Sequence, residues 1–157
     1  MKKLFSLTMC LLLALAMLVG CSSGKDRADA DIDWQYKTVD EVKAMLDAQE
    51  SVIVLDTRLE EKYNEGHIPG SIHKAVFPLD TPELENALKE LVTELQGDDP
   101  IVVVCNSGQK VAKRAVSVLQ DEGIAPERLF ILEGGAGAWI SSQEASAEGG
   151  SSDDECS

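Results

Sequence analysis

The chain has 157 residues and a strong excess of acid, with 28 Asp and Glu against 14 Lys and Arg and a formal net charge of −14. Nucleic acids are bound through basic surfaces, so this charge excludes nucleic acid as a partner. The length and the hydrophobic fraction of 44% fit one folded domain with a modest core.

Residues 1–20 have the pattern of an export signal. A positive start precedes an apolar run from Leu4 to Val19, which is shorter than the ~20 apolar residues of a membrane-spanning helix. A transmembrane anchor is therefore the weaker interpretation. The run ends in Leu-Val-Gly-Cys at residues 18–21, which resembles the lipobox of bacterial lipoproteins.

The lipobox resemblance implies a lipoprotein signal peptide over residues 1–20, with cleavage before Cys21 and acylation of its thiol. The protein is then exported and held at a membrane by that lipid. In a Gram-negative cell, Ser22 after the modified cysteine favours the periplasmic side of the outer membrane.

Polar segments flank the part of the chain that we expect to fold. Residues 21–33 are interpreted as a polar linker, and residues 141–157, rich in Ser, Gly and acid, as a disordered tail. The domain is expected over residues 34–140. Cys156 is interpreted as incidental; the alternative is a reversible disulfide with Cys105.

The first half of the domain alternates helical and strand patterns. Thr38 and Glu41 have the spacing of a capping box and predict the start of a helix. Residues 51–55 (SVIVL) predict a buried strand. Thr81 and Pro82 predict the start of a second helix, whose apolar residues recur at helical spacing to Leu95.

The second half repeats this alternation. Residues 101–104 (IVVV) predict a buried strand, a helix follows that ends near Gly123, and residues 129–132 (LFIL) predict a last strand. Strands separated by amphipathic helices indicate an α/β fold with a parallel sheet covered on both faces. Ligands of such sheets bind beyond the carboxyl ends of the strands.

Cys105 stands at one such end, on a short polar turn between the strand and the next helix. Backbone N–H groups of the turn and the helix dipole favour negative charge, so they stabilise a thiolate. We expect this sulfur to be reactive and exposed. The alternative is a buried structural cysteine, which is disfavoured because polar turn residues make a poor hydrophobic wrapping.

Four segments occur in an order and spacing that resemble the rhodanese domain. They are residues 56–58 (DTR), 66–72 (GHIPGSI), 105–110 (CNSGQK) and 134–139 (GGAGAW). The resemblance implies a single rhodanese-like α/β domain with a central parallel sheet of about five strands and helices on both faces. It also implies a sulfurtransferase that takes sulfane sulfur from an anionic donor such as thiosulfate, holds it as a cysteine persulfide, and passes it to cyanide or a thiol, including a protein thiol.

This chemistry assigns Cys105 as the nucleophile and the next six residues as the substrate-binding segment. The segment consists of Asn106, Ser107, Gly108, Gln109, Lys110 and Val111. Its N–H groups can bind the departing sulfite. Lys110 stands where many relatives carry Arg, so it offers a point charge in place of a bidentate fork. Arg114 is either a second cation for the site or a solvated helix charge.

Six other matched residues are interpreted as structural. They are Asp56, Arg58, His67, Gly134, Gly135 and Trp139. The first two can hold loops by hydrogen bonds at a strand end, and the histidine can anchor the tight turn after it. The glycine pair permits close backbone approach beside Cys105, and the tryptophan packs at the end of the core. His73 is interpreted as a surface residue.

Two histidines without nearby cysteines give no metal-ligand set, so we expect no metal and no cofactor, and we expect a monomer. A cysteine phosphatase needs a loop one residue longer that closes on Arg, whereas residue 111 is Val. A dithiol oxidoreductase needs Cys-x-x-Cys, which residues 105–108 lack. A role without turnover, as a sulfur carrier, sensor or partner-binding domain, stays open because a retained Cys105 suits a carrier and an enzyme alike.

Overall fold

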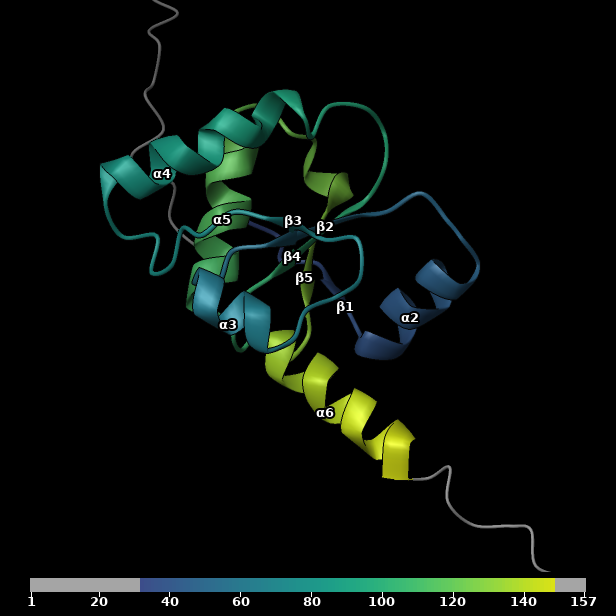
Figure 1. Ribbon diagram of the computed structural model, residues 1–157. Coiled ribbons are helices and arrows are strands. Elements are labelled where there is room, and N and C mark those ends of the chain that lie inside the picture. The colour runs from purple at the N-terminus through teal and green to yellow at the C-terminus, as the bar shows by residue number, and fades with distance from the viewer. Residues whose placement is uncertain (1–31, 149–157) are drawn as a thin grey trace, which may run out of the picture.

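The computed structural model describes residues 32–148, which form a five-stranded parallel sheet with helices on both faces (Figure 1). The strands are β1 (Tyr36–Lys37), β2 (Ile53–Asp56), β3 (Ile72–His73), β4 (Ile101–Val104) and β5 (Leu129–Leu132). They lie in the order β1-β5-β4-β2-β3, and every neighbouring pair is parallel. The predicted α/β fold is confirmed.

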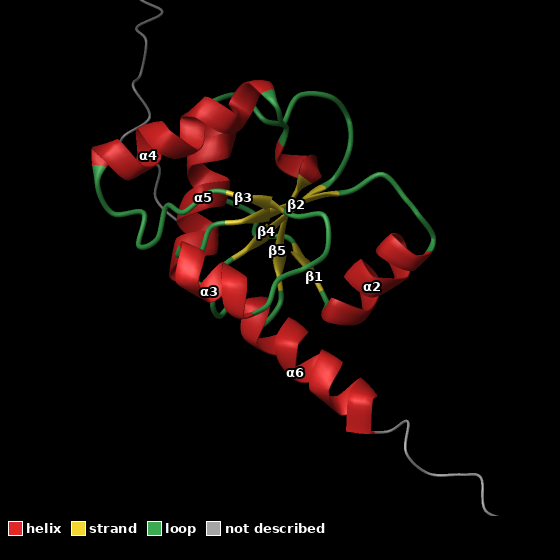
Figure 2. Ribbon diagram, viewed as in Figure 1, coloured by secondary structure: helices red, strands yellow, loops and turns green. Residues whose placement is uncertain are grey.

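Within the described residues, four α-helices connect the strands and a fifth follows the last strand. They are α2 (Val39–Asp47), α3 (Glu60–Glu65), α4 (Pro82–Lys89), α5 (Lys110–Asp121) and α6 (Gly135–Glu148), with short 3₁₀ turns η3 (Glu90–Thr93) and η4 (Pro126–Arg128). Helices α4 and α5 pack together on one side of the sheet, and α2 and α6 lie on the other (Figure 2). Within residues 32–148 no helix is long and apolar enough to cross a membrane.

The two faces of β4 form two separate cores. Ile101 and Val103 belong to the cluster that includes α4 and α5 residues, whereas Val102 and Val104 belong to the cluster of α2 and α6. All four are at most 1% exposed. Side chains alternate between the faces of a strand, so a strand that is covered on both faces needs an unbroken apolar run.

The predicted helix ends are confirmed at two positions. The Thr38 hydroxyl accepts from the Glu41 N–H at 3.2 Å, and the Glu41 carboxylate accepts from the Thr38 N–H at 2.7 Å, which completes the capping box. Gly123 follows α5 with φ of +92°, and its N–H bonds the Gln120 carbonyl at 3.0 Å. A left-handed residue after a helix is readily supplied by glycine.

Four predicted ranges differ from the structure. The strand predicted over residues 51–55 is β2, which spans Ile53–Asp56. The helix that begins after Thr81 is α-helical only to Lys89 and continues as the tighter turn η3. Ile32 is 7% exposed, so the folded part begins before residue 34. Residues 141–148 are not a disordered tail, because α6 continues through them. An established helix adds one hydrogen bond per residue, and Ala and Glu are good helix formers.

The remaining predictions at the chain ends fall outside the described residues. They concern the signal peptide, the greater part of the linker with Cys21, and the tail from residue 149 with Cys156. They stay predictions.

Candidate active site

Cys105 directly follows β4, which lies between β5 and β2 near the middle of the sheet. Its neighbours at this edge are therefore the segments that follow β2 and β5. The expectation of an exposed sulfur is wrong, because Cys105 is 3% exposed and belongs to the α5-side core cluster. Side chains alternate between the two faces of a strand, so Cys105 points to the same face as Ile101 and Val103, which α5 covers. The thiol is therefore buried, and it is free.

The loop that follows is anchored to the start of α6. We call residues 105–109 the Cys105 loop. The Cys105 carbonyl accepts a hydrogen bond from the Ala136 N–H at 2.8 Å, and the Asn106 carbonyl accepts one from the Gly137 N–H at 3.2 Å. The C=O and N–H of a trans peptide point in opposite directions, so the N–H groups of Asn106 and Ser107, which share these two peptides, point away from α6.

Unused donors distinguish this loop from an ordinary buried strand end. Within residues 32–148, the N–H groups of residues 106–109 meet no hydrogen-bond acceptor. The first-turn N–H groups of α5 likewise have no partner in their own helix. A free thiol at the start of a loop with such donors fits a site for an anionic sulfur species better than a purely structural cysteine.

Two glycines allow the Cys105 loop and the start of α6 to lie in contact. Gly135 has φ of +60°, and a Cβ there would lie 2.4 Å from the Cys105 carbonyl oxygen and 2.6 Å from the Gly108 nitrogen. Gly108 has φ of +68°, and its Cβ would lie 2.4 Å from the Leu132 carbonyl oxygen. Close approach beside the cysteine, which we predicted for the glycine pair, is confirmed at Gly135.

Asp56 and Arg58 form a buried ion pair at the end of β2. Arg58 Nη2 donates to Asp56 Oδ2 at 2.8 Å, and the side chains of Arg58 and Asp56 are 3% and 1% exposed. The same Nη2 donates to the Gly66 carbonyl at 2.7 Å. The pair thus holds the segment after α3 against the end of β2, in agreement with the prediction that Asp56 and Arg58 hold loops by hydrogen bonds.

An aromatic stack extends this support, and its central residue was not predicted. The Tyr63 ring lies between the His67 ring, 3.9 Å away, and the His73 ring, 4.2 Å away. His67 Nδ1 is hydrogen-bonded to the Tyr63 carbonyl at 3.0 Å, which confirms it as a loop anchor. The interpretation of His73 as surface is wrong, because its Nε2 is hydrogen-bonded to the Arg58 carbonyl at 2.9 Å. Only the i, i+4 spacing of Tyr63 and His67 hinted at this contact.

Thr57 is a second residue that the sequence did not single out. Its backbone N–H and its hydroxyl both donate to the Val104 carbonyl, at 2.9 Å and 2.8 Å. The residue is fully buried. These two bonds fix the peptide that leads into Cys105, and the only sequence signal for them is the position of a hydroxyl residue directly after a buried strand.

Of the two cationic residues considered for the site, Lys110 has no described ion-pair partner and Arg114 has one. Lys110 is the exposed first residue of α5, and no described carboxylate forms an ion pair with it. Arg114 is ion-paired with Glu85 of α4, so it is not a solvated helix charge. Val111 is 6% exposed in the core cluster, and only its backbone is available to a ligand. Asn106, Ser107 and Gln109 are exposed.

The other predicted residues have structural surroundings. Trp139 is 5% exposed in the α2-side core cluster, which confirms that it packs in the core. Gly134 has φ of +70°, and a Cβ there would lie 2.7 Å from the Ala138 Cβ. Among the described residues, no three His, Cys, Asp or Glu side chains are placed to hold a metal ion.

Fold and site together define an α/β domain with a free cysteine in a donor-rich loop at the carboxyl edge of its sheet. The model of the rhodanese-like domain matches residues 38–142, and the chain belongs to this family. The match covers all four segments on which the resemblance was based.

Two relatives share about a third of their aligned residues with the chain. It is 33% identical over 92 residues to the thiosulfate sulfurtransferase GlpE of Pseudoalteromonas translucida, covering 58% of this chain and 75% of that protein. It is 31% identical over 81 residues to YrkF of Bacillus subtilis, which bears the name "putative sulfur carrier protein". That alignment covers 52% of this chain and only 38% of YrkF.

Solved structures of the same family have the same fold. Ygr203w from yeast, described as a protein tyrosine phosphatase of the rhodanese family, matches with a TM-score of 0.53 at 27% identity, covering 68% of this chain and 84% of that one. The rhodanese-like domain of Alr3790 from Anabaena matches with a TM-score of 0.55 at 21% identity, covering 80% and 92%.

Proposed function

We propose that this protein is a sulfurtransferase that moves sulfane sulfur from a small anionic donor, such as thiosulfate, to a thiophilic acceptor through a persulfide on Cys105. The observation that carries the proposal is the free thiol of Cys105 at the start of a loop whose N–H groups at residues 106–109 meet no acceptor in the described chain. The similarity to a thiosulfate sulfurtransferase supports it.

The reaction has two displacement steps. In the first, the Cys105 thiolate attacks the outer sulfur of thiosulfate; a new S–S bond forms on Sγ, the old S–S bond breaks, and sulfite leaves with its electron pair. In the second, the acceptor attacks the outer sulfur of the persulfide, and Cys105 leaves as the thiolate. N–H donors of the Cys105 loop stabilise the anionic sulfur in both steps, and Lys110 adds positive charge.

A sulfur carrier is the second candidate, favoured by the similarity to YrkF and by the burial of Cys105. A carrier forms the same persulfide but discharges it only to a partner. Phosphatase activity, which the description of Ygr203w raises, is disfavoured because residue 111, where a phosphatase loop would carry Arg, is a core Val. This matches the sequence argument on loop length.

Cyanolysis separates the enzyme from the carrier. The purified protein is incubated with thiosulfate and cyanide, and thiocyanate is measured over time. The enzyme releases many equivalents of thiocyanate per protein, whereas a carrier, which discharges only to its partner, releases almost none. A Cys105→Ser variant that releases thiocyanate at the wild-type rate would overturn the proposal in both forms.

The proposal extends to location. The lipobox at residues 18–21 supports an exported lipoprotein anchored through acylated Cys21, on the periplasmic side of the outer membrane if the cell is Gram-negative. Mass spectrometry of the mature N-terminal peptide tests this. We expect a peptide that begins with lipid-modified Cys21, and we expect no such peptide from a Cys21→Ser protein. An unmodified peptide that begins at Met1 would contradict the anchor.

A further inference from the structure

A cleft of about 590 Å³ lies beside the Cys105 loop, between α4 and α5. It begins at Gln109 and Lys110, where the loop joins α5, and reaches Ser117. At 1.5 Å per helical residue, this is a length of roughly 10 Å along α5. Its opposite wall consists of residues 78–80 and Glu85 of α4.

The cleft walls are held in place without a ligand. Glu85 and Arg114 join α4 to α5 through an ion pair. Leu79 is 2% exposed, so its burial holds the backbone of residues 78–80 against the core. A preformed cleft of this size is in the range that binds small molecules, about 300–1,000 Å³.

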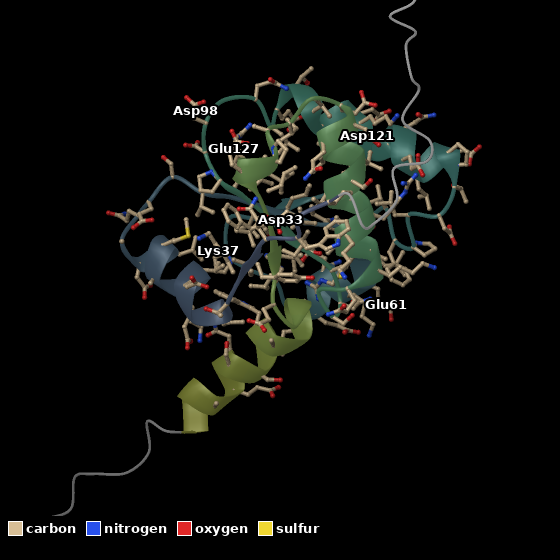
Figure 3. The ribbon with its side chains drawn as sticks, turned by 180° about the vertical axis from the view of Figure 1, so that it is seen from behind. Asp33, Lys37, Glu61, Asp98, Asp121 and Glu127 are labelled. Atoms are coloured by element: carbon tan, nitrogen blue, oxygen red, sulfur yellow. The ribbon has the colours of Figure 1, made fainter. Side chains whose placement is uncertain are left out.

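The charge of the cleft differs from that of the whole protein. The formal net charge of the chain is −14. Acidic side chains such as Asp98, Asp121, Glu127 and Glu61 lie on different sides of the domain (Figure 3). The cleft nevertheless has three cations along α5, of which Arg114 is paired with Glu85.

The two remaining cations, Lys110 and Lys113, are available to an anion. No described carboxylate pairs with either of them. The Lys113 ammonium lies 5.4 Å from the centroid of the Trp34 ring, a contact that orients the amine without neutralising it. Asp80 is the one cleft carboxylate outside the Glu85–Arg114 pair.

We infer that this cleft binds the sulfur acceptor, and that the acceptor is a low-molecular-weight thiol that carries carboxylates. This inference rests on the proposed function and names its acceptor class. Thiosulfate and cyanide are too small to need such a cleft. A carboxylated thiol can place its carboxylates on Lys110 and Lys113 while its sulfur reaches toward Cys105 at the loop end of the cleft.

The transfer step balances without a further reagent. The acceptor thiolate attacks the outer sulfur of the Cys105 persulfide, and a bond forms between the two sulfurs. The bond from Cys105 Sγ to the outer sulfur breaks, and Cys105 leaves with the electron pair as a thiolate. The product is the persulfide of the acceptor.

The test compares two acceptors in single turnover. Cys105 is first loaded with thiosulfate, excess donor is removed, and loss of the persulfide is followed with mercaptosuccinate or with 2-mercaptoethanol at equal thiolate concentration. We expect faster discharge by mercaptosuccinate, which carries two carboxylates. Equal rates for the two thiols would overturn the inference.

Matched variants locate the effect. Lys113→Met keeps the aliphatic stem and removes the charge. It should slow persulfide discharge by mercaptosuccinate about fivefold, as expected for one exposed charge contact, and leave the rate of discharge by 2-mercaptoethanol unchanged. Lys43→Met is the control, because Lys43 lies 5.7 Å from the Trp139 ring centroid, outside this cleft. Asp80→Asn should accelerate discharge by mercaptosuccinate, because it removes a negative charge from the cleft. If Lys113→Met and Lys43→Met behave alike, the inference is wrong.

Discharge by cyanide separates this inference from the proposed function. If cyanide empties the persulfide but mercaptosuccinate has no advantage, the sulfurtransferase stands and the cleft assignment fails. If thiosulfate does not load Cys105, the proposed donor fails, and inorganic polysulfide loads the thiol so that the two acceptors can still be compared.

Discussion

The backbone of Gly135 lies directly against that of Cys105, so that a methyl group at residue 135 would come within 2.4 Å of the Cys105 carbonyl oxygen. The next residue, Ala136, donates its N–H to this same oxygen at 2.8 Å. Helix α6 therefore sets the position of the Cys105 loop through its first two residues, and the side of the loop away from α6 is left for an anion.

Gly135→Ala should displace the Cys105 loop. The added methyl group would also meet the Gly108 nitrogen, and φ of +60° is unfavourable for alanine. Overpacking costs about 1–3 kcal/mol and the left-handed backbone about 1 kcal/mol more. We expect a loss of unfolding free energy in this range, measured by denaturant titration, together with loss of persulfide formation on Cys105.

Gly70→Ala is the matched control. Gly70 has φ of +78°, but nothing lies within 4 Å of a Cβ there. It should lose only the backbone contribution, about 1 kcal/mol, and keep persulfide formation. If Gly135→Ala is no more damaging than Gly70→Ala in either measurement, the contact with Cys105 does not position the loop.

The buried pair Asp56–Arg58 should show strong coupling in a double-mutant cycle. Arg58→Met leaves the Asp56 carboxylate buried without its partner, which costs about 3–5 kcal/mol of unfolding free energy. The double variant Asp56→Asn/Arg58→Met should lose much less than the two single losses added together. Additive losses would contradict the coupling. Lys62→Met serves as the control, because its partner Glu65 is half exposed and little change is expected.

Much of the fold could be predicted because its central strands are unbroken apolar runs. Residues 101–104 and 129–132 were predicted with their observed bounds. Strands β1 and β3 have two residues each, which is too short for any periodic signal. The sequence predicts no helix in place of α6, because its first residues are rich in Gly and residues 141–148 have no apolar stripe.

The candidate site was predictable where it is local in sequence and not where it depends on packing. The turn after Cys105 was recognised from its neighbours. The roles of Thr57 and Tyr63 depend on contacts with Val104 and with His73, which only the folded chain brings together. The burial of Cys105 could have been predicted from its even spacing with Ile101 and Val103.

Lys110 should contribute to binding of the sulfur donor. Lys110→Ala removes an exposed charge next to the Cys105 loop, so the KM for thiosulfate should rise by less than about tenfold. Lys110→Arg should hold or lower this KM, because a guanidinium can bind the donor oxygens with two hydrogen bonds. Steady-state cyanolysis gives both values. An unchanged KM in both variants would place Lys110 among the solvated surface charges.

The capping box predicts a loss of stability in acid. The Glu41 carboxylate accepts hydrogen bonds from the backbone N–H and the hydroxyl of Thr38. These bonds hold the pKa of Glu41 below its ordinary value of 4.5, and the bond from the backbone N–H has the larger effect. A lowered pKa means that the carboxylate stabilises the fold above this ordinary value, and that the contribution is lost as pH falls through the lowered pKa.

Glu41→Gln tests this pH dependence. The variant should unfold more readily than wild type at pH 7, and the difference should shrink as the pH falls below 4.5. Denaturant titrations at several pH values give the difference directly. A difference that stays constant, or grows toward acid, would show that the charge of Glu41 does not stabilise the start of α2.

The central claim is that Cys105 carries the sulfur, and intact mass measures it most directly. After incubation with thiosulfate, the purified protein should gain one sulfur, about 32 Da, located by peptide mapping to Cys105 and removed by cyanide. Cys105→Ser should gain nothing. No added mass on the wild-type protein, or an equal gain on Cys105→Ser, would contradict the account.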